Sequence, residues 1–441
     1  MKGRIAIWAL IPLAWLLAGC HGVALPPERA SRARLAGVSN ELAVLPTLGP
    51  EAALGDYLRF AMLNQPTVRA AFADWQVSVE RITVERSRPD PQLTFQAYIQ
   101  NAVTSVMPGL MQALPGPGKL KAAGNLAAAE SDGKFFAFEA AALRAAFGLK
   151  QAFYQIWFLD EKLRIDRATA RLLTQLEQSA RAQNEVGKVT LQDVYRAQIE
   201  EDRLQNEITN LEDARSLWRT KFKAALGRQA NDADPPLPSR FESTPLALGG
   251  DEVLTAALAQ NPTLKMAEAE VRAAEAAIAV ARKTKIPDFT AGLSVDAKAA
   301  PIFYWPQASM TLPIWRDKIA AQIAGAQAQK RAAEARLSAA QIDLTVDFAA
   351  KAYDYRENTR ALALLGEHLI PKARQSLEIA RAGYLSGGID FFNLIDAERS
   401  LLNFQLEEAE ARSRREITLA EISLSIAGIA PAGAPFYEDK P

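Results

Sequence analysis

The sequence is poor in the residues that most often carry out chemistry in proteins. Among its 441 residues are one cysteine, Cys20, and two histidines, His21 and His368. A single cysteine forms no internal disulfide and no cysteine-based metal cluster, and two histidines leave little material for a histidine-based catalytic site. The sequence contains no glycine-rich phosphate loop and no hydrolase or zinc-protease motif. It therefore predicts a protein that is not an enzyme and that holds no cofactor and no metal.

The chain also lacks an excess of charge and a long apolar run. Its 51 basic residues are balanced by 51 acidic residues, whereas nucleic-acid-binding proteins usually carry a basic surface. Beyond the N-terminal region, no apolar stretch reaches the roughly 20 residues that a transmembrane helix needs. We therefore expect no nucleic-acid partner and no membrane-spanning helix in the mature chain.

Residues 1–19 are expected to be removed as a signal peptide. Two basic residues precede a short apolar stretch, and a Leu-Ala-Gly-Cys motif ends at Cys20. The pattern resembles a bacterial lipoprotein signal, so Cys20 is the predicted lipidation site; the alternative is an ordinary signal peptide with a chance cysteine. His21 stands where an aspartate would favour retention in the inner membrane, so the cell outer membrane is the expected location. Residues 20–53 are predicted to form an extended arm.

The rest of the chain is a tandem duplication. Asn-Gln-Pro-Thr at 64–67 returns as Gln-Asn-Pro-Thr at 260–263, 196 residues later. Asp-Val-Tyr-Arg-Ala-Gln at 193–198 returns as Asn-Leu-Ile-Asp-Ala-Glu at 393–398, 200 residues later. The order of paired motifs is kept while the offset drifts, as expected when small insertions follow a duplication. We predict a first repeat at 54–228, a linker at 229–249, a second repeat at 250–429 and a C-terminal tail at 430–441.

Each repeat contains two segments in which apolar and polar residues alternate. The expected strands span about 92–100 and 107–114, and about 288–296 and 304–312. Apolar side chains on one face and polar ones on the other are typical of transmembrane β-barrels. Four strands cannot close around a lumen, whereas three chains would supply twelve; the alternative is a soluble sheet that packs its apolar face on a core. The expected outward face comprises Leu93, Phe95, Ala97, Ile99, Phe289, Ala291, Leu293, Val295, Ala308, Met310 and Leu312.

A very long helical pattern follows the strands of each repeat. Residues 119–185 contain no proline and are rich in strong helix formers, so they predict one helix of roughly 100 Å at 1.5 Å per residue. The chain then reverses at a glycine turn at 186–190, and a return helix covers 191–226. The second repeat repeats this arrangement, with a long helix at 317–384, a turn at 385–389 and a return helix at 390–427. Pro371 should kink or break this second long helix.

This order of elements, duplicated behind a lipoprotein signal, resembles the TolC-like outer membrane factor family of Gram-negative efflux and secretion systems. The residues that carry the resemblance are Pro66 and Pro262, the strand exit at 312–315, and the turn-plus-helix motifs at 187–194 and 388–401. The resemblance implies a mainly α-helical fold with a small β part. In that fold four strands per chain contribute to a trimeric twelve-stranded β-barrel, joined to a periplasmic α-helical barrel.

The same resemblance implies function and partners. A homotrimer would form a passive duct that docks on a periplasmic adaptor, a membrane fusion protein, fed by an inner-membrane pump of the RND type. Pro-Asp-Pro-Gln-Leu at 89–93 and Leu-Pro-Gly-Pro-Gly-Lys at 114–119 are similar to the heavy-metal efflux branch of the family, so heavy-metal cations are the expected cargo. Efflux of drugs or organic toxins, type I secretion, and a soluble periplasmic coiled-coil spacer stay open as alternatives.

The resemblance also marks a candidate gate at the periplasmic end of the tunnel, which the family narrows with acidic rings. The matching residues are Asp193, Asn393 and Asp396, with Asp390 one helical turn earlier. Asn393 stands where the family commonly has aspartate, which would reduce the charge of the ring. A threefold ring of carboxylates attracts cations. The alternative role for Asp193 and Asp390 is to complement a helix N-terminus.

Glycines mark the two helical turns. Gly187, Gly387 and Gly388 are expected to serve the backbone of these turns, because glycine tolerates conformations that other residues avoid. The turns would be exposed at the end of the tunnel, so they are also the candidate docking site for the adaptor.

Overall fold

The computed structural model describes residues 23–42, 46–49, 51–99, 103–238, 240–241, 250–299 and 301–426. The chain divides into two compact units. The first unit combines the stretch up to Ser39 with Asp74–Lys134 and Glu268–Ala335, and the second combines Asn40–Ala73, Phe135–Ala267 and the remainder from Arg336. Cys20, the predicted signal peptide and the predicted tail at 430–441 lie outside the described residues.

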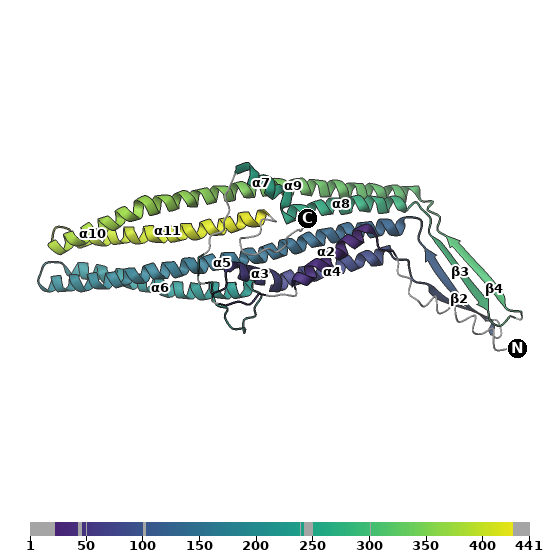
Figure 1. Ribbon diagram of the computed structural model, residues 1–441, viewed down its shortest axis with the longest axis horizontal. Helices are drawn as coiled ribbons and strands as arrows, with labels where there is room; N and C mark the ends of the chain where they lie inside the picture. The colour runs from purple at the N-terminus through teal and green to yellow at the C-terminus, as the bar shows by residue number, and fades with distance from the viewer. Residues whose placement is uncertain are drawn as a thin grey trace. The chain divides into compact units, whose positions relative to one another are not determined.

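The elements occur in the same order in both repeats. Each repeat has a short helix, a second helix, two strands, a long helix and a return helix (Figure 1). Among the described residues, none of the helices combines the length and the apolarity that crossing a membrane requires. The elements are α2 (Pro26–Leu42), α3 (Leu54–Asn64), α4 (Pro66–Arg86), β1 (Gln92–Ile99), β2 (Val103–Leu114), α5 (Lys119–Glu185), α6 (Leu191–Ala225), α7 (Gly250–Gln260), α8 (Pro262–Lys283), β3 (Phe289–Asp296), β4 (Phe303–Met310), α9 (Arg316–Leu364), η1 (Leu365–Leu369), α10 (Ile370–Ser386) and α11 (Phe391–Ser425).

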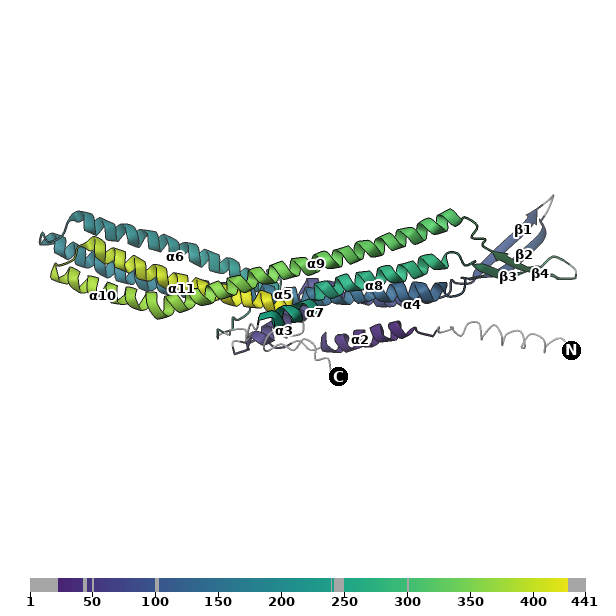
Figure 2. The same ribbon diagram turned by 90° about the horizontal axis from the view of Figure 1, so that it is seen from above.

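The four strands form one antiparallel sheet in the order β1-β2-β3-β4 (Figure 2). Leu93 pairs with Leu110, Leu110 with Leu293, and Leu293 with Pro306, so these side chains share one face. Ser294, the next residue along β3, belongs to the neighbouring row of paired residues, whose side chains lie on the opposite face. The alternation in the sequence therefore corresponds to one apolar face and one face of mostly polar or small residues.

The apolar face of the sheet is exposed and the polar face is partly covered. Leu93 is 81% exposed, whereas Ser294 is 3% exposed. A soluble antiparallel sheet would bury its apolar face and expose the polar one. The exposure is therefore the reverse of that in a soluble sheet.

β2 begins earlier than the sequence predicts. Its first residue is Val103 rather than about residue 107, because its pairing with β1 extends to Ile99, across an irregularity that follows Tyr98. Such a bulge disturbs the alternation from which a strand is recognised. The other three strands differ from the predicted bounds by only one or two residues.

The long helix of the first repeat is continuous, whereas that of the second repeat contains a π turn. α5 runs for 67 residues. α9 ends at Leu364, the five-residue π-helical turn η1 follows, and the helix continues as α10. Pro371 lies at the start of α10, where its missing N–H removes one α-helical hydrogen bond. The disturbance expected at Pro371 is thus a wider helical turn just before the proline, from which the helix goes on.

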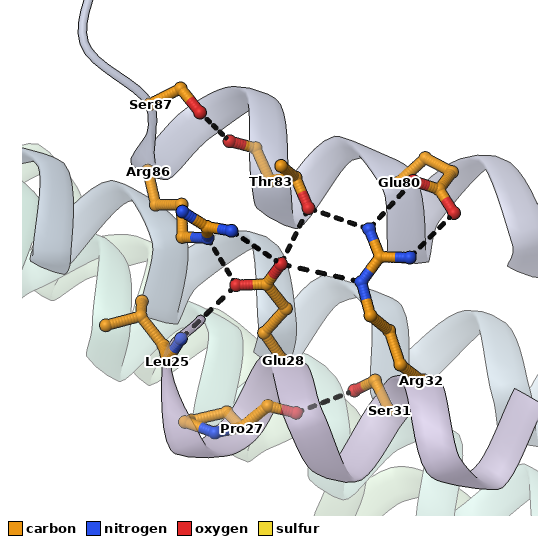
Figure 3. A network of polar contacts seen from close by, with 9 residues as sticks. All are labelled: Leu25, Pro27, Glu28, Ser31, Arg32, Glu80, Thr83, Arg86 and Ser87. Atoms are coloured by element: carbon orange, nitrogen blue, oxygen red, sulfur yellow. Dashed lines mark hydrogen bonds and ion pairs between the residues drawn. The ribbon is translucent and has the colours of Figure 1, made fainter. Parts of the chain in front are cut away.

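The N-terminal segment contradicts its prediction. Residues 26–42 form the helix α2, whereas an extended arm was expected. Pro26 starts the helix, a position that proline favours, and the buried side chain of Glu28 joins α2 to α4 (Figure 3). Thr83 Oγ1 donates to Glu28 Oε1 at 2.6 Å, and Arg86 Nη2 donates to the same oxygen at 3.1 Å. Contacts with a distant helix therefore stabilise a segment whose local sequence is a weak helix signal.

Candidate functional site

The two glycine turns lie at one end of a helical bundle in the second unit (Figures 1 and 2). The bundle is formed by α5, α6, α10 and α11, which share one apolar core. Leu173, Leu204, Leu377 and Leu401 contribute to it, one from each helix. Long helices with apolar residues spaced three and four apart pack in this way in coiled coils. The position of both turns is therefore set by a continuous apolar core.

The first turn connects α5 to α6. Gly187 has a φ of 72°, a left-handed conformation that glycine adopts without strain. Thr190 is the N-cap of α6, and its hydroxyl donates to Asp193 Oδ2 at 2.9 Å while its backbone N–H donates to the same oxygen at 3.2 Å. This is a capping box, so Asp193 serves the helix N-terminus.

The second turn connects α10 to α11. Gly387 has a φ of 82°, whereas Gly388 is not among the residues of positive φ and donates its N–H to the Gly383 carbonyl at 2.8 Å. Asp390 is the N-cap of α11 and accepts a hydrogen bond from the backbone N–H of Asn393 at 2.9 Å. Asp390 therefore serves the helix N-terminus as well, and only one of the two adjacent glycines needs the freedom of glycine.

Contacts between the repeats bring the two turns together. The guanidinium carbon of Arg196 lies 5.8 Å from the ring centroid of Phe392, within cation–π range. Tyr384 packs edge-on against Phe391 with centroids 5.5 Å apart, and its buried hydroxyl has no hydrogen-bond partner among the described residues. Burial raises the pKa of Tyr384, and the negative charge of Asp193 raises it further. Asp193 of the first repeat thus lies near a tyrosine of the second.

The remaining gate candidates stay at the surface of the single chain. Asn393 and Asp396 are exposed and lie three residues apart on α11, so they share a side of that helix. Asp390 is exposed as well, whereas Asp193 is half-buried. Asp390 is therefore hydrogen-bonded to Asn393, and Asp193 to Thr190. Asp396 is exposed and can face solvent or another chain.

An ion pair links α6 to α11 behind the turns. Arg399 Nε donates to Glu200 Oε2 at 3.3 Å, and a second guanidinium nitrogen donates to Glu200 Oε1. Sequence reasoning missed this pair. The available signal was that Glu200 and Arg399 carry opposite charges at nearly equivalent positions of the two repeats, 199 residues apart.

Comparison with known families accounts for the duplicated architecture. A model described as outer membrane efflux protein matches residues 58–228 and again residues 253–428. The chain belongs to the outer membrane efflux protein family. The two matches fall on the two copies of the duplication. Membership of this channel family agrees with the expectation that the chain is not an enzyme.

Among relatives of known function, this outer membrane efflux protein is similar to the cobalt-zinc-cadmium resistance protein CzcC of Cupriavidus metallidurans. The two are 22% identical over 267 residues, which cover 58% of this chain and 61% of CzcC. The match thus spans about three fifths of the length of that relative.

Solved structures share the fold of this efflux protein. CusC has a TM-score of 0.74 at 16% identity, over 85% of this chain and 92% of CusC. VceC from Vibrio cholerae has a TM-score of 0.70 at 17% identity, over 87% of this chain and 97% of VceC. The MtrE channel of Neisseria gonorrhoeae, solved in its open state, has a TM-score of 0.73 at 18% identity, over 89% and 97%. The likeness confirms the expected TolC-like fold, mainly α-helical with a small β part.

Metal ligands do not cluster in this efflux protein within the described ranges, since no group of three or more His, Cys, Asp or Glu side chains there could hold an ion. The candidate site is instead a set of charged and polar side chains around two helical turns. Such a set can attract or repel ions and can hold helices together, so its chemistry is electrostatic.

Proposed function

We propose that this protein is the outer-membrane channel component of a tripartite efflux system and acts as a passive duct. The observation that carries the proposal is the family match to both repeats. The exposed apolar face of the sheet adds support, because lipid would cover it favourably. The long helices of both repeats would continue the duct into the periplasm.

Three copies of the chain would form the duct. Four strands are too few to enclose a lumen, and the helical part also presents unpaired apolar surface. Along α9, Ile342, Val346, Tyr353 and Leu364 are each at least 50% exposed. Apolar side chains aligned in this way usually mark an interface, and neighbouring copies in a homotrimer would cover them.

The proposed location is the cell outer membrane, with the helical part in the periplasm. Lipidation at Cys20 would anchor the N-terminus there, since several acyl chains hold a protein far more firmly than one. The proposed partners are a periplasmic adaptor, which would dock at the tip turns around Gly187, Gly387 and Gly388, and an inner-membrane pump of the RND type.

Heavy-metal cations are the proposed cargo. The similarity to a protein named for resistance to cobalt, zinc and cadmium favours them over drugs, organic toxins or secreted protein. The scarcity of metal ligands agrees with a passive duct, because selection of the ion would reside in the pump.

Deletion of the gene should lower tolerance to cobalt, zinc or cadmium salts severalfold and leave tolerance to antibiotics unchanged. Growth on graded metal salts and on graded antibiotics measures both, and complementation with the wild-type gene is the control. Unchanged metal tolerance together with new antibiotic sensitivity would favour the drug-efflux alternative instead.

We further propose that the tip turns form the gate. Asp193, Asp390 and Asp396 would place carboxylates around the threefold axis, and Asn393 would reduce the charge of that ring. The pair Arg399–Glu200 would hold the two repeats together in the closed state.

Replacing Arg399 with glutamine should raise the open probability about 1.4- to fivefold. A partly exposed ion pair contributes about 0.2–1 kcal/mol, and its loss favours opening by that amount. Planar lipid bilayer recordings of the purified trimer measure the change. Arg203→Gln is the matched control, because Arg203 pairs with the same Glu200 from within α6, at 3.3 Å, and bridges no repeats. Equal effects of the two variants would refute the gate role of Arg399.

A further inference from the structure

Two carboxyl groups lie in the apolar core of the bundle. Asp166 on α5 is 1% exposed and Glu398 on α11 is 5% exposed. Asp166 lies three residues after Leu163 and seven before Leu173, which is the spacing of core positions in packed helices. A charged group in such a position is costly unless it is paired.

Neither carboxyl group is fully paired. Both oxygens of Asp166 and Oε2 of Glu398 are buried without a hydrogen-bond partner among the described residues. Thr169, one helical turn beyond Asp166, hydrogen-bonds to Glu398 and so connects the two repeats. An unpaired carboxylate costs far more free energy to bury than a neutral carboxylic acid does. Protonation would therefore remove most of this cost at both residues.

A cavity adjoins Glu398. It measures about 200 Å³ and lies between α5, α6 and α11, lined by Thr169, Leu204, Ile395 and Leu402 in addition to Glu398. Its volume can admit water. Water from the cavity could therefore deliver a proton to Glu398 or remove one from it.

The charged neighbours of Asp166 do not neutralise it. Lys162 on α5 and Glu207 on α6 face it, but Lys162 Nζ is engaged by Glu207 Oε1 at 2.6 Å. Burial raises the pKa of Asp166 to about 6; the charge of Lys162 opposes this rise and that of Glu207 adds to it.

The charged neighbours of Glu398 are also largely engaged with one another. Glu200, Arg203, Glu207 and Arg399 line the same cavity, and both arginines pair with Glu200. Burial raises the pKa of Glu398, and the Thr169 hydrogen bond and the charge of Arg381 on α10 oppose this only in part.

We propose that Asp166 and Glu398 form a proton-binding device that tightens the bundle behind the tip turns on acidification and loosens it as the pH rises. The device lies between α5 of the first repeat and α11 of the second, which the hydrogen bond between Thr169 and Glu398 connects. Its consequence for conductance rests on the proposed function as a duct. The tightening of the bundle does not depend on that function.

The direction in which stability changes with pH follows from proton linkage. Asp166 titrates near pH 4 when unfolded and at about 6 when folded. The folded state then binds the proton more tightly, so stability falls as the pH rises through that window, and above it the full cost of the buried charge remains. The protonated fraction of Asp166 should drop from about nine tenths at pH 5 to about one tenth at pH 7.

The test uses the full-length protein in detergent and compares wild type with Asp166→Asn, Glu398→Gln and the double variant. We expect wild type to melt at a higher temperature at pH 5 than at pH 7, and the double variant to lose this difference. Infrared spectroscopy should show a protonated carboxyl band that disappears between these pH values in wild type and is absent from the double variant. Asp213→Asn, which alters an exposed acid on α6, should behave as wild type.

Two results would overturn the inference. One is a double variant that keeps the wild-type pH dependence of melting; the other is a wild type without the carboxyl band at pH 5. If a variant fails to fold, the infrared carboxyl band and the pH dependence of melting of the wild type still test the inference. Bilayer recordings at pH 5 and pH 7 add a separate readout, in which open probability should be severalfold lower at pH 5. Absence of any conductance would count against the duct, and the melting and infrared results would still judge the proton device.

Discussion

Replacing Arg86 with methionine should make the release of α2 from α4 easier by about 3–5 kcal/mol. Removing one partner of a buried ion pair leaves the other charge poorly compensated, and this is what costs such an amount. The guanidinium that would remain beside Glu28 is that of Arg32 on α2, which lies 3.5 Å from Glu28 Oε1 and also pairs with Glu80 of α4. Glu28 is 1% exposed, and Arg86 supplies its only guanidinium from α4. Amide hydrogen exchange within α2 should accelerate by a factor of about one hundred to several thousand, since 1.4 kcal/mol is tenfold.

Two controls make this prediction specific. Arg34→Met on the same helix should change exchange little, because Arg34 and Asp132 are a half-exposed pair 3.3 Å apart and such pairs contribute about 0–1 kcal/mol. The double variant Glu28→Gln, Arg86→Met should recover most of the loss, since the glutamine is neutral. Equal exchange in Arg86→Met and Arg34→Met would mean that the network of Figure 3 does not hold α2 in place.

The same network should fail in acid. Burial alone would raise the pKa of Glu28, but hydrogen bonds from Arg86, Thr83 and the Leu25 N–H, with the charge of Arg86, lower it to about 2. Because the folded pKa is depressed, the stabilisation is complete above the ordinary pKa of 4.5 and is lost as the pH falls toward 2. Pepsin, which is active in this window, should cut α2 progressively faster there in wild type, and at a uniformly high rate in Arg86→Met.

An arginine at position 308 should prevent stable insertion into the outer membrane, whereas an arginine at position 309 should be tolerated. Ala308 and Ser309 are adjacent in β4 and both are exposed in the chain. They point to opposite faces of the sheet, Ala308 to the apolar face and Ser309 to the polar one. An arginine in lipid costs about 2–4 kcal/mol near the bilayer midplane, and three symmetry-related copies would multiply that cost.

Fractionation of cells that express each variant measures the effect. Heat-modifiable trimers in the outer membrane should be lost for Ala308→Arg and retained for Ser309→Arg. Equal recovery of both variants in a water-soluble fraction would contradict the membrane role of the sheet and favour the periplasmic spacer. Loss of both variants would point to a general folding defect, and exchange of Ala308 for serine would then show whether charge or side-chain size is responsible.

Much of the fold could be predicted because its signals are local. Alternation along residues 92–99 and 289–296 specifies strands with one apolar face, and a glycine such as Gly187 marks a reversal in a long helical pattern. The duplication then supports each assignment twice. α2 could not be predicted in the same way, because the contacts of Glu28 with Thr83 and Arg86 reach 55 and 58 residues along the chain.

The candidate site was only partly accessible from the sequence. Asp193 and Asp390 stand at helix starts, and their capping roles follow from that position. The links across the repeats, such as Arg196 with Phe392, depend on how four helices pack, which no local pattern reveals. Asp166 and Glu398 did carry a signal, since each interrupts a run of core positions, but a carboxylate in such a run is informative only once the burial of that face is established.

The π turn at Leu365–Leu369 has a consequence for the symmetry of a ring of such chains. One extra residue in a helical turn rotates everything beyond it by about 100° around the helix axis. α5 has no such turn, so the faces of the two long helices can no longer be exchanged for one another. A ring built from six identical single repeats would have no place for this difference. A ring of three such chains can therefore be threefold but not sixfold symmetric, and two identical half-chains could not replace one chain in it.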